Sequence, residues 1–199
     1  MVYDFEEDPT CPVVHDYIKR NATNNIFLIR NNVGNGRGVI NAIKTGITRV
    51  AGEATLVLMA DLSDDISQID GMYRLIQEGA DIICASRYMK GGKKIGGPRL
   101  KTLMSRVAGL SLHYVFGVPT VDATNAFKMY RTKILHEIQI ESTGGFEYSL
   151  EIVLKAFKKG YKIVEIPTVW RDRATGKSNF KLMKWLPKYI KTYLRIFKS

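Results

Sequence analysis

The residues best suited to chemistry lie in an acidic turn, residues 61–65, directly after an apolar run at residues 55–59. If that run is a strand of an open α/β sheet, the turn stands where such sheets bind ligands, beyond the carboxyl end of a strand. Grouped hard oxygen donors suit Mg²⁺ or Mn²⁺, which can bridge to a diphosphate. We expect Asp61 to serve such a cation, whereas Asp64 and Asp65 are expected to cap the helix that follows.

Two loops elsewhere in the chain have the composition of phosphate-binding segments. Residues 34–38 are glycine-rich and precede a predicted helix, so their N–H groups could cradle a phosphate; they match neither GxxxxGK[ST] nor GxGxxG. Residues 171–178 combine two guanidinium groups with a hydroxyl, and guanidinium forks bind phosphate in a bidentate way. Either loop could equally be a solvated turn.

Apolar runs bounded by turn signals alternate with helical patterns, which predicts βαβ units and a single α/β domain. The run at 55–59 is continuously apolar, as a central parallel strand would be. Pro167 suggests that the last strand lies at an edge or ends there. Residues 90–98 are basic and glycine-rich, so we expect a loop without regular structure. The other strands are expected at 26–29, 81–85, 126–130 and 161–169, and helices at 37–50, 69–78, 100–116 and 148–159.

The amino-acid composition says more about the kind of binding partner than about the fold. The 199 residues are 45% hydrophobic and 25% charged, as in globular proteins. A net charge of +11 favours anionic partners: nucleic acid, an acidic membrane surface or phosphorylated substrates. Nucleic acid is the least favoured of these, because basic and aromatic residues are not interleaved on an evident sheet face. Two distant cysteines and three scattered histidines predict no zinc site.

The chain has no sequence feature that would carry it across a membrane. The N-terminus is acidic where a signal peptide would be basic, and no apolar run approaches the ~18 residues that a spanning helix needs. We therefore expect a cytoplasmic protein that is peripheral on the inner face of the membrane.

Residues 180–199 are expected to form an amphipathic helix, set apart from a domain at residues 1–179. Such a helix suits the interface of an anionic membrane, although it could also pack on the domain with a solvated basic face. Pro187 would start or kink it. At about 100° per residue, the apolar face holds Met183, Leu186, Ile190, Tyr193, Leu194 and Phe197, and the opposite face holds Lys184, Lys188, Lys191, Arg195 and Lys198.

The order and spacing of the motifs resemble family 2 glycosyltransferases of the dolichol-phosphate mannosyltransferase type over nearly the whole chain. No single motif is specific; their combination is. The matching residues are Val2-Tyr3-Asp4 with Asp8, Gly36-Arg37-Gly38 with Ala42 and Gly46, Met59-Ala60-Asp61-Leu62-Ser63, Ser86-Arg87-Tyr88 with Gly91-Gly92, Ser105-Arg106, Asp122 with Phe127, Glu165-Ile166-Pro167, and Asp172-Arg173 with Gly176 and Ser178.

This resemblance implies an α/β GT-A (Rossmann-like) fold with a mostly parallel sheet, which moves a sugar from a nucleotide-diphosphate donor to a polyprenyl phosphate. It also implies a role for each matching residue, with Mg²⁺ or Mn²⁺ as the cofactor. By this resemblance, Asp4, Arg37 and Asp61 bind the donor, and Asp61 and Ser63 bind the metal. Asp61 and Asp122 are the catalytic residues at the reaction centre. The residues implied to bind the acceptor phosphate are Arg87, Lys101, Ser105, Arg173 and Ser178.

Three departures from the family pattern bear on activity. Met59 replaces the first acid of the metal motif and is a poor ligand for a hard cation. Lys101 replaces an arginine in the acceptor site, which exchanges a fork for a point charge. The family's first strand and helix have no counterpart before Met1, so an N-terminally incomplete fold is expected.

Two rival functions stand beside this one, and the departures at Met59 and at the N-terminus motivate the second. One is an enzyme of the same fold that uses a saccharide acceptor. The other is a degenerate, non-catalytic relative or fragment that binds a lipid or a membrane-protein partner without turnover. The enzyme that acts on a lipid phosphate is preferred because it accounts for the acidic turn, the basic loops and the amphipathic tail together.

Overall fold

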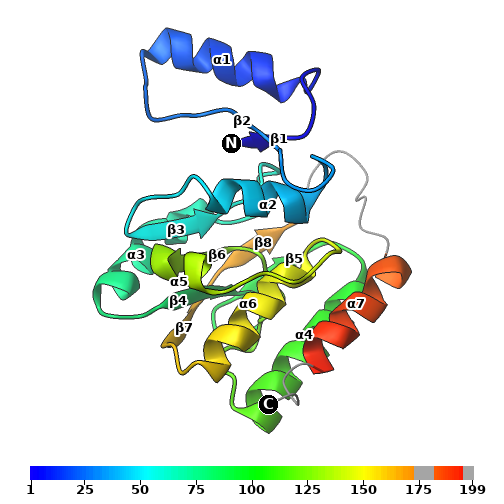
Figure 1. Cartoon of the computed structure of the whole chain (residues 1–199). Helices are drawn as coiled ribbons and strands as arrows, with labels where there is room; N and C mark the ends of the chain where they lie inside the picture. Colours follow the sequence, from blue (N-terminus) through cyan, green and yellow to red (C-terminus); the bar gives the residue numbers. More distant parts are fainter. Residues whose placement is uncertain (173–181, 195–199) are drawn as a thin grey trace. The chain divides into compact units, whose positions relative to one another are not determined.

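The computed structural model describes residues 1–172 and 182–194, and it contains two compact units, Met1–Ala51 and Gly52–Ser199 (Figure 1). The boundary predicted near residue 180 lies outside the described residues. In the first unit, β1 (Val2–Tyr3) pairs in parallel with β2 (Ile29–Arg30). The helices of this unit are α1 (Thr10–Asn21), which the sequence analysis did not predict, and α2 (Val39–Ile47).

The second unit contains a four-stranded sheet in the order β3-β6-β4-β7. Strand β6 (Lys128–Arg131) runs antiparallel to both β3 (Ala54–Val57) and β4 (Ile82–Ser86), and β7 (Ile163–Pro167) runs parallel to β4. The prediction of a central parallel strand at 55–59 is therefore wrong, because β3 ends this sheet and pairs with β6 alone within it. A continuous apolar run reports burial and carries no information about strand direction.

Helices cover the sheet of the second unit, and the predicted ones are confirmed to within a few residues. A buried cluster that includes Met72, Ile76, Ile83 and Phe127 packs α3 against β4 and β6. The helical elements are η1 (Ile66–Gln68), α3 (Ile69–Gln77), α4 (Arg99–Phe116), α5 (Thr132–Glu137), α6 (Glu147–Lys158) and α7 (Leu182–Leu194).

A second, two-stranded sheet corrects the prediction of an irregular loop at residues 90–98. Strand β5 (Lys93–Ile95) pairs in parallel with β8 (Val169–Arg171). The chain can fold back over the end of β4 because residue 92 is glycine: a Cβ there would lie 2.4 Å from the Ser86 carbonyl oxygen. Pro167 ends β7 at the sheet's edge, as predicted, and β8 follows one residue later.

Gly109 sets how closely α4 approaches the rest of the second unit. A Cβ at this position would lie 2.0 Å from the carbonyl oxygen of Val121, so only glycine permits the observed packing. The helix is thereby pressed against the backbone that leads directly into Asp122. This contact fixes the middle of α4 against the loop that carries Asp122.

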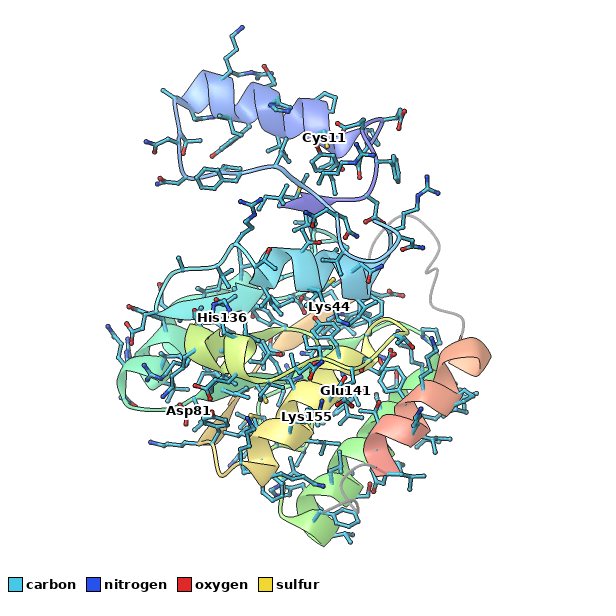
Figure 2. The ribbon with its side chains drawn as sticks, in the orientation of Figure 1. Cys11, Lys44, Asp81, His136, Glu141 and Lys155 are labelled. Carbon is cyan, nitrogen blue, oxygen red and sulfur yellow. The ribbon has the colours of Figure 1, made fainter. Side chains whose placement is uncertain are left out.

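Two buried carboxylates hold the loop that precedes α6. Glu147 accepts hydrogen bonds from the N–H groups of Gly144 (2.6 Å) and Gly145 (2.7 Å), and Glu151 accepts from the N–H of Glu141 at 2.9 Å. Figure 2 shows Glu141 beside Lys155 of α6, with 3.5 Å between the charged groups. The loop is therefore anchored to the helix that it enters.

Helix α7 lies alongside α4 in Figure 1 and is joined to it through Tyr193. The Tyr193 hydroxyl donates a 2.9 Å hydrogen bond to Ser111, and its ring meets Phe116 edge-on. Two members of the predicted apolar face, Ile190 and Leu194, are each 49% exposed. Among residues 1–172 and 182–194, no helix is long and apolar enough to span a bilayer.

Candidate active site

The acidic turn closes on itself just beyond the end of β3. Asp61 Oδ1 accepts a hydrogen bond from the N–H of Ser63 at 3.1 Å. Leu62 between them has a left-handed backbone (φ 57°) and is almost wholly exposed. A non-glycine residue in this conformation stores roughly 1 kcal/mol or more of strain, and such strain concentrates at functional sites.

The two acids that follow have different environments, although both were predicted to cap a helix. Asp65 does cap: it precedes η1, and its carboxylate accepts from the N–H of Ser67 at 3.1 Å. The prediction is wrong for Asp64, which is partly buried and lies before the residue that caps η1. Burial, and then the neighbouring Asp61 charge, raise the pKa of Asp64 to about 6.

Ser63 lies at the centre of the turn with its hydroxyl buried. In the described part of the chain its Oγ has no hydrogen-bond partner, while its carbonyl accepts from the N–H of Arg171 at 2.9 Å. A buried polar atom without a partner is uncommon and requires an explanation. The turn opens on a cavity of about 280 Å³ that is lined by Leu62, Ser63, Asp64, Asp65, Ile66, Val169 and Arg171.

The oxygen donors of the turn fit a divalent cation. Within the described residues no three His, Cys, Asp or Glu side chains gather around one point. Asp61, Asp64 and the orphaned Ser63 hydroxyl nevertheless offer three hard ligands, and Mg²⁺ or Mn²⁺ commonly takes the rest of its shell from phosphate and water. Met59 lies half-buried past the end of β3, and its thioether is too soft to contribute.

Arg87 and Asp122 form a buried ion pair beyond the end of β4. Asp122 is fully buried and accepts hydrogen bonds from Arg87 Nε and Nη2 at 2.7 Å and from the Arg87 N–H at 2.9 Å. Burial opposes the charge on Arg87, but the Asp122 carboxylate raises the arginine's pKa above its ordinary value. Glu165 of β7 holds the loop that carries Asp122, because its carboxylate accepts hydrogen bonds from Thr120 Oγ1 at 2.8 Å and from the Val121 N–H at 2.9 Å.

This geometry bears on the role predicted for Asp122. Both of its carboxylate oxygens are engaged by Arg87, and the side chain has no exposed surface. Asp122 therefore orients the guanidinium, and the arrangement does not present it as a free base. The sequence analysis predicted both residues but not this pairing across 35 positions.

Two of the residues expected to bind acceptor phosphate lie on the first turns of α4. The Ser105 hydroxyl lies 2.5 Å from the hydroxyl of Tyr88, which follows Arg87, and Lys101 is one turn earlier on the same helix. The structure thus brings the Arg87 backbone, Ser105 and the start of α4 together. Arg173 and Ser178 lie outside the described residues.

In the first unit, Asp4 and Arg37 line one cavity of about 390 Å³ together with Asn31 and Gly36. The Asp4 carboxylate accepts from Asn31 Nδ2 and from the N–H of Gly38, both at 2.8 Å, and so fixes the glycine-rich loop. Gly36 has φ 67°, and a Cβ there would lie 2.9 Å from the Asn31 carbonyl oxygen. Their role in donor binding stays a prediction.

The fold and site define the class of protein. An acidic turn and a cationic, hydroxyl-rich site at the carboxyl ends of α/β strands are typical of a nucleotide-sugar transferase of the GT-A fold. The chain belongs to glycosyl transferase family 2, whose sequence profile matches residues 1–139.

Two curated relatives act on polyprenol-type lipids according to their names. Polyprenol monophosphomannose synthase of Mycolicibacterium smegmatis is 26% identical over 165 residues, which cover 76% of this chain and 62% of the relative. Dolichol-phosphate mannosyltransferase of Pyrococcus furiosus is 28% identical over 166 residues, which cover 81% and 46%. The chain thus spans about half to two thirds of the length of these relatives.

Solved structures of glucosyl-3-phosphoglycerate synthase from Mycobacterium tuberculosis share the fold. The complex with phosphoglyceric acid has a TM-score of 0.65 at 13% identity and covers 98% of this chain and 67% of its own. The complex with Mn²⁺, uridine diphosphate and glucosyl-3-phosphoglycerate has a TM-score of 0.62 at 12% identity, with coverage of 91% and 64%. At this identity the likeness establishes the fold alone.

Proposed function

We propose that this chain transfers a sugar from a nucleotide-diphosphate donor to a polyprenyl phosphate at a membrane surface. The observation that carries the proposal is that the second unit holds both an acidic turn with oxygen donors for a cation and a cationic site with hydroxyl groups for a phosphate. The names of the curated relatives support a lipid phosphate as acceptor and mannose as the first sugar to test.

The proposed reaction does not need a strong general base. An acceptor phosphate oxygen attacks the anomeric carbon, the bond from that carbon to the donor diphosphate breaks, and the configuration inverts. The attacking oxygen is already anionic at neutral pH, so orientation and charge stabilisation supply most of the rate. Arg87, held by Asp122, and Ser105 with Lys101 would orient the acceptor. Bound Mg²⁺ or Mn²⁺ would neutralise the departing diphosphate, with Asp61, Ser63 and Asp64 as its ligands.

The exposed faces of α4 and α7 suit a lipid substrate. Leu100, Leu103 and Val107 follow one another along α4 and are each more than half exposed, while Ile190 and Leu194 are half exposed on the adjoining α7. Apolar side chains beside exposed cations favour the interface of an anionic membrane. The first turns of α4, which are proposed to bind the phosphate, would then lie at headgroup level, which supports a peripheral enzyme at the membrane surface.

The test is sugar transfer by the purified chain. Vesicles containing polyprenyl phosphate are mixed with labelled nucleotide sugars, nucleotide-activated mannose first, in the presence of Mn²⁺. We expect label in the lipid fraction. Label in an added saccharide but none in lipid would replace the acceptor; donor binding without any transfer, or no metal-dependent donor binding by calorimetry, would favour a non-catalytic relative.

A further inference from the structure

Lys94, the middle residue of β5, has its ammonium group held in place from two sides. In the β5–β8 pairing it stands opposite Trp170, and its Nζ lies 5.2 Å from the centre of that ring. The same Nζ donates a hydrogen bond to Thr102 Oγ1 on the first turn of α4. A lysine ammonium fixed by an aromatic ring and a hydroxyl has given up much of its freedom, so it is pre-organised for a third partner.

The partner of Lys94 connects it to the acceptor side of the site. Ser105 donates to the carbonyl oxygen of Thr102 at 3.0 Å and pairs with the Tyr88 hydroxyl. Lys94 therefore contacts the same turns of α4 that bear Lys101 and Ser105. Its neighbour Lys93 is exposed, and successive side chains of a strand point to opposite faces.

Charges of the same sign gather around Lys94. Partial burial, then Arg87 and Lys101, lower its pKa to about 8, while Asp122 and Asp172 act in the opposite direction. Asp122 is already engaged in its bidentate pair with Arg87. Cations assembled at the expense of mutual repulsion are stabilised when an anion binds among them.

We propose that Lys94 binds the phosphate of the acceptor, supplying a second ammonium beside Lys101 where the family pattern has a single guanidinium. The inference rests on the proposed function and extends it, because it assigns a binding role to a residue outside the family motifs. A phosphomonoester dianion carries two charges and three acceptor oxygens. Two lysine ammonium groups can meet those charges, Lys94 from β5 and Lys101 from α4.

The test compares Lys94→Met with the matched variant Lys93→Met in the full chain. Methionine keeps an unbranched apolar chain against Trp170 and removes only the charge and the donor. Calorimetric titrations use inorganic phosphate, a short-chain polyprenyl phosphate, and a nucleoside diphosphate with Mn²⁺. A charge-assisted hydrogen bond contributes about 1.5–3 kcal/mol, so Lys94→Met should lose about tenfold or more in affinity for both inorganic phosphate and the polyprenyl phosphate.

Three outcomes separate this proposal from its rivals. Unchanged binding of the diphosphate by Lys94→Met, with unchanged binding of every probe by Lys93→Met, supports the acceptor assignment. Selective loss of affinity for the diphosphate in Lys94→Met would assign Lys94 to donor binding and overturn the proposal. The proposal would also be overturned if Lys94→Met bound phosphate as tightly as the unmodified chain does. If the chain transfers no sugar but its phosphate binding still depends on Lys94, the phosphate site stands and the proposed function fails.

Discussion

The pair formed by Arg87 and Asp122 permits a prediction in which stability and catalysis separate. Asp122→Ala removes the three hydrogen bonds that the carboxylate accepts from Arg87 and leaves the guanidinium, only 11% exposed at its side chain, without its counter-charge. Breaking a buried pair on one side costs about 3–5 kcal/mol. Because domains are stable by only about 5–15 kcal/mol, urea unfolding followed by circular dichroism should show a large fall in the midpoint.

The matched perturbation removes both charges. Arg87→Met alone leaves a buried carboxylate and should cost a similar amount, whereas the double variant Arg87→Met/Asp122→Leu should recover most of the loss, because an apolar pair of similar volume often replaces a buried ion pair without penalty. Sugar transfer should not recover. If the separate costs of Arg87→Met and Asp122→Leu add in the double variant, or if Asp122→Ala costs less than about 1 kcal/mol, the pair is not a coupled structural unit.

Three further predictions concern the metal, the pH and the membrane. Asp61→Asn should abolish turnover and Mn²⁺ binding, and Asp64→Asn should weaken Mn²⁺ binding measured by calorimetry. Asp65→Asn should leave Mn²⁺ binding intact, because asparagine also caps a helix. Equal effects of Asp64→Asn and Asp65→Asn would contradict the assignment of ligands. Between pH 7.5 and 9.5 a phosphomonoester is already a dianion. Its affinity should therefore fall as Lys94 of the unliganded chain loses its proton above about pH 8. Lys94→Arg stays charged and should flatten that profile; a profile identical to that of the unmodified chain would show that Lys94 does not set the pH dependence of phosphate binding. Leu103→Glu, at a position 59% exposed, should reduce co-sedimentation with anionic vesicles without changing the affinity for inorganic phosphate, and unchanged co-sedimentation would exclude α4 from the membrane contact.

The sequence predicts the helices of the second unit better than its sheet. Helix α3, for example, was predicted at 69–78 and is observed at Ile69–Gln77, and its buried residues Met72 and Ile76 lie one turn apart. Strand direction has no such signature. The position of β6 between β3 and β4 depends on how the chain returns across the sheet, so the apolar residues at 126–130 could identify a strand but not its neighbours.

The candidate site, too, could be predicted only in part from the sequence. Asp61, Ser63, Arg87 and Ser105 were predicted from motif order, because each stands at a fixed place after a strand or on a helix. Lys94 could not be singled out from its neighbours, since three basic and apolar residues in a glycine-rich stretch give no period by which to recognise β5. Only pairing with β8 decides which lysine faces Trp170.

Strand β8 links the acidic turn to the proposed phosphate-binding site. Its Arg171 donates a backbone hydrogen bond to the Ser63 carbonyl at 2.9 Å, and the next N–H, from Asp172, reaches the Ile95 carbonyl at the end of β5, also at 2.9 Å. The strand is thus bonded on one side to the turn proposed to hold the cation and on the other to the strand that carries Lys94. Backbone hydrogen bonds do not depend on the identity of a side chain, so this alignment tolerates methionine at position 59 and lysine at position 101. Methionine at position 59 removes a hard ligand for the cation, and lysine at position 101 replaces a guanidinium fork by a point charge. In their proposed roles, Asp64 would supply an oxygen ligand to the cation and Lys94 would supply a second ammonium group to the phosphate.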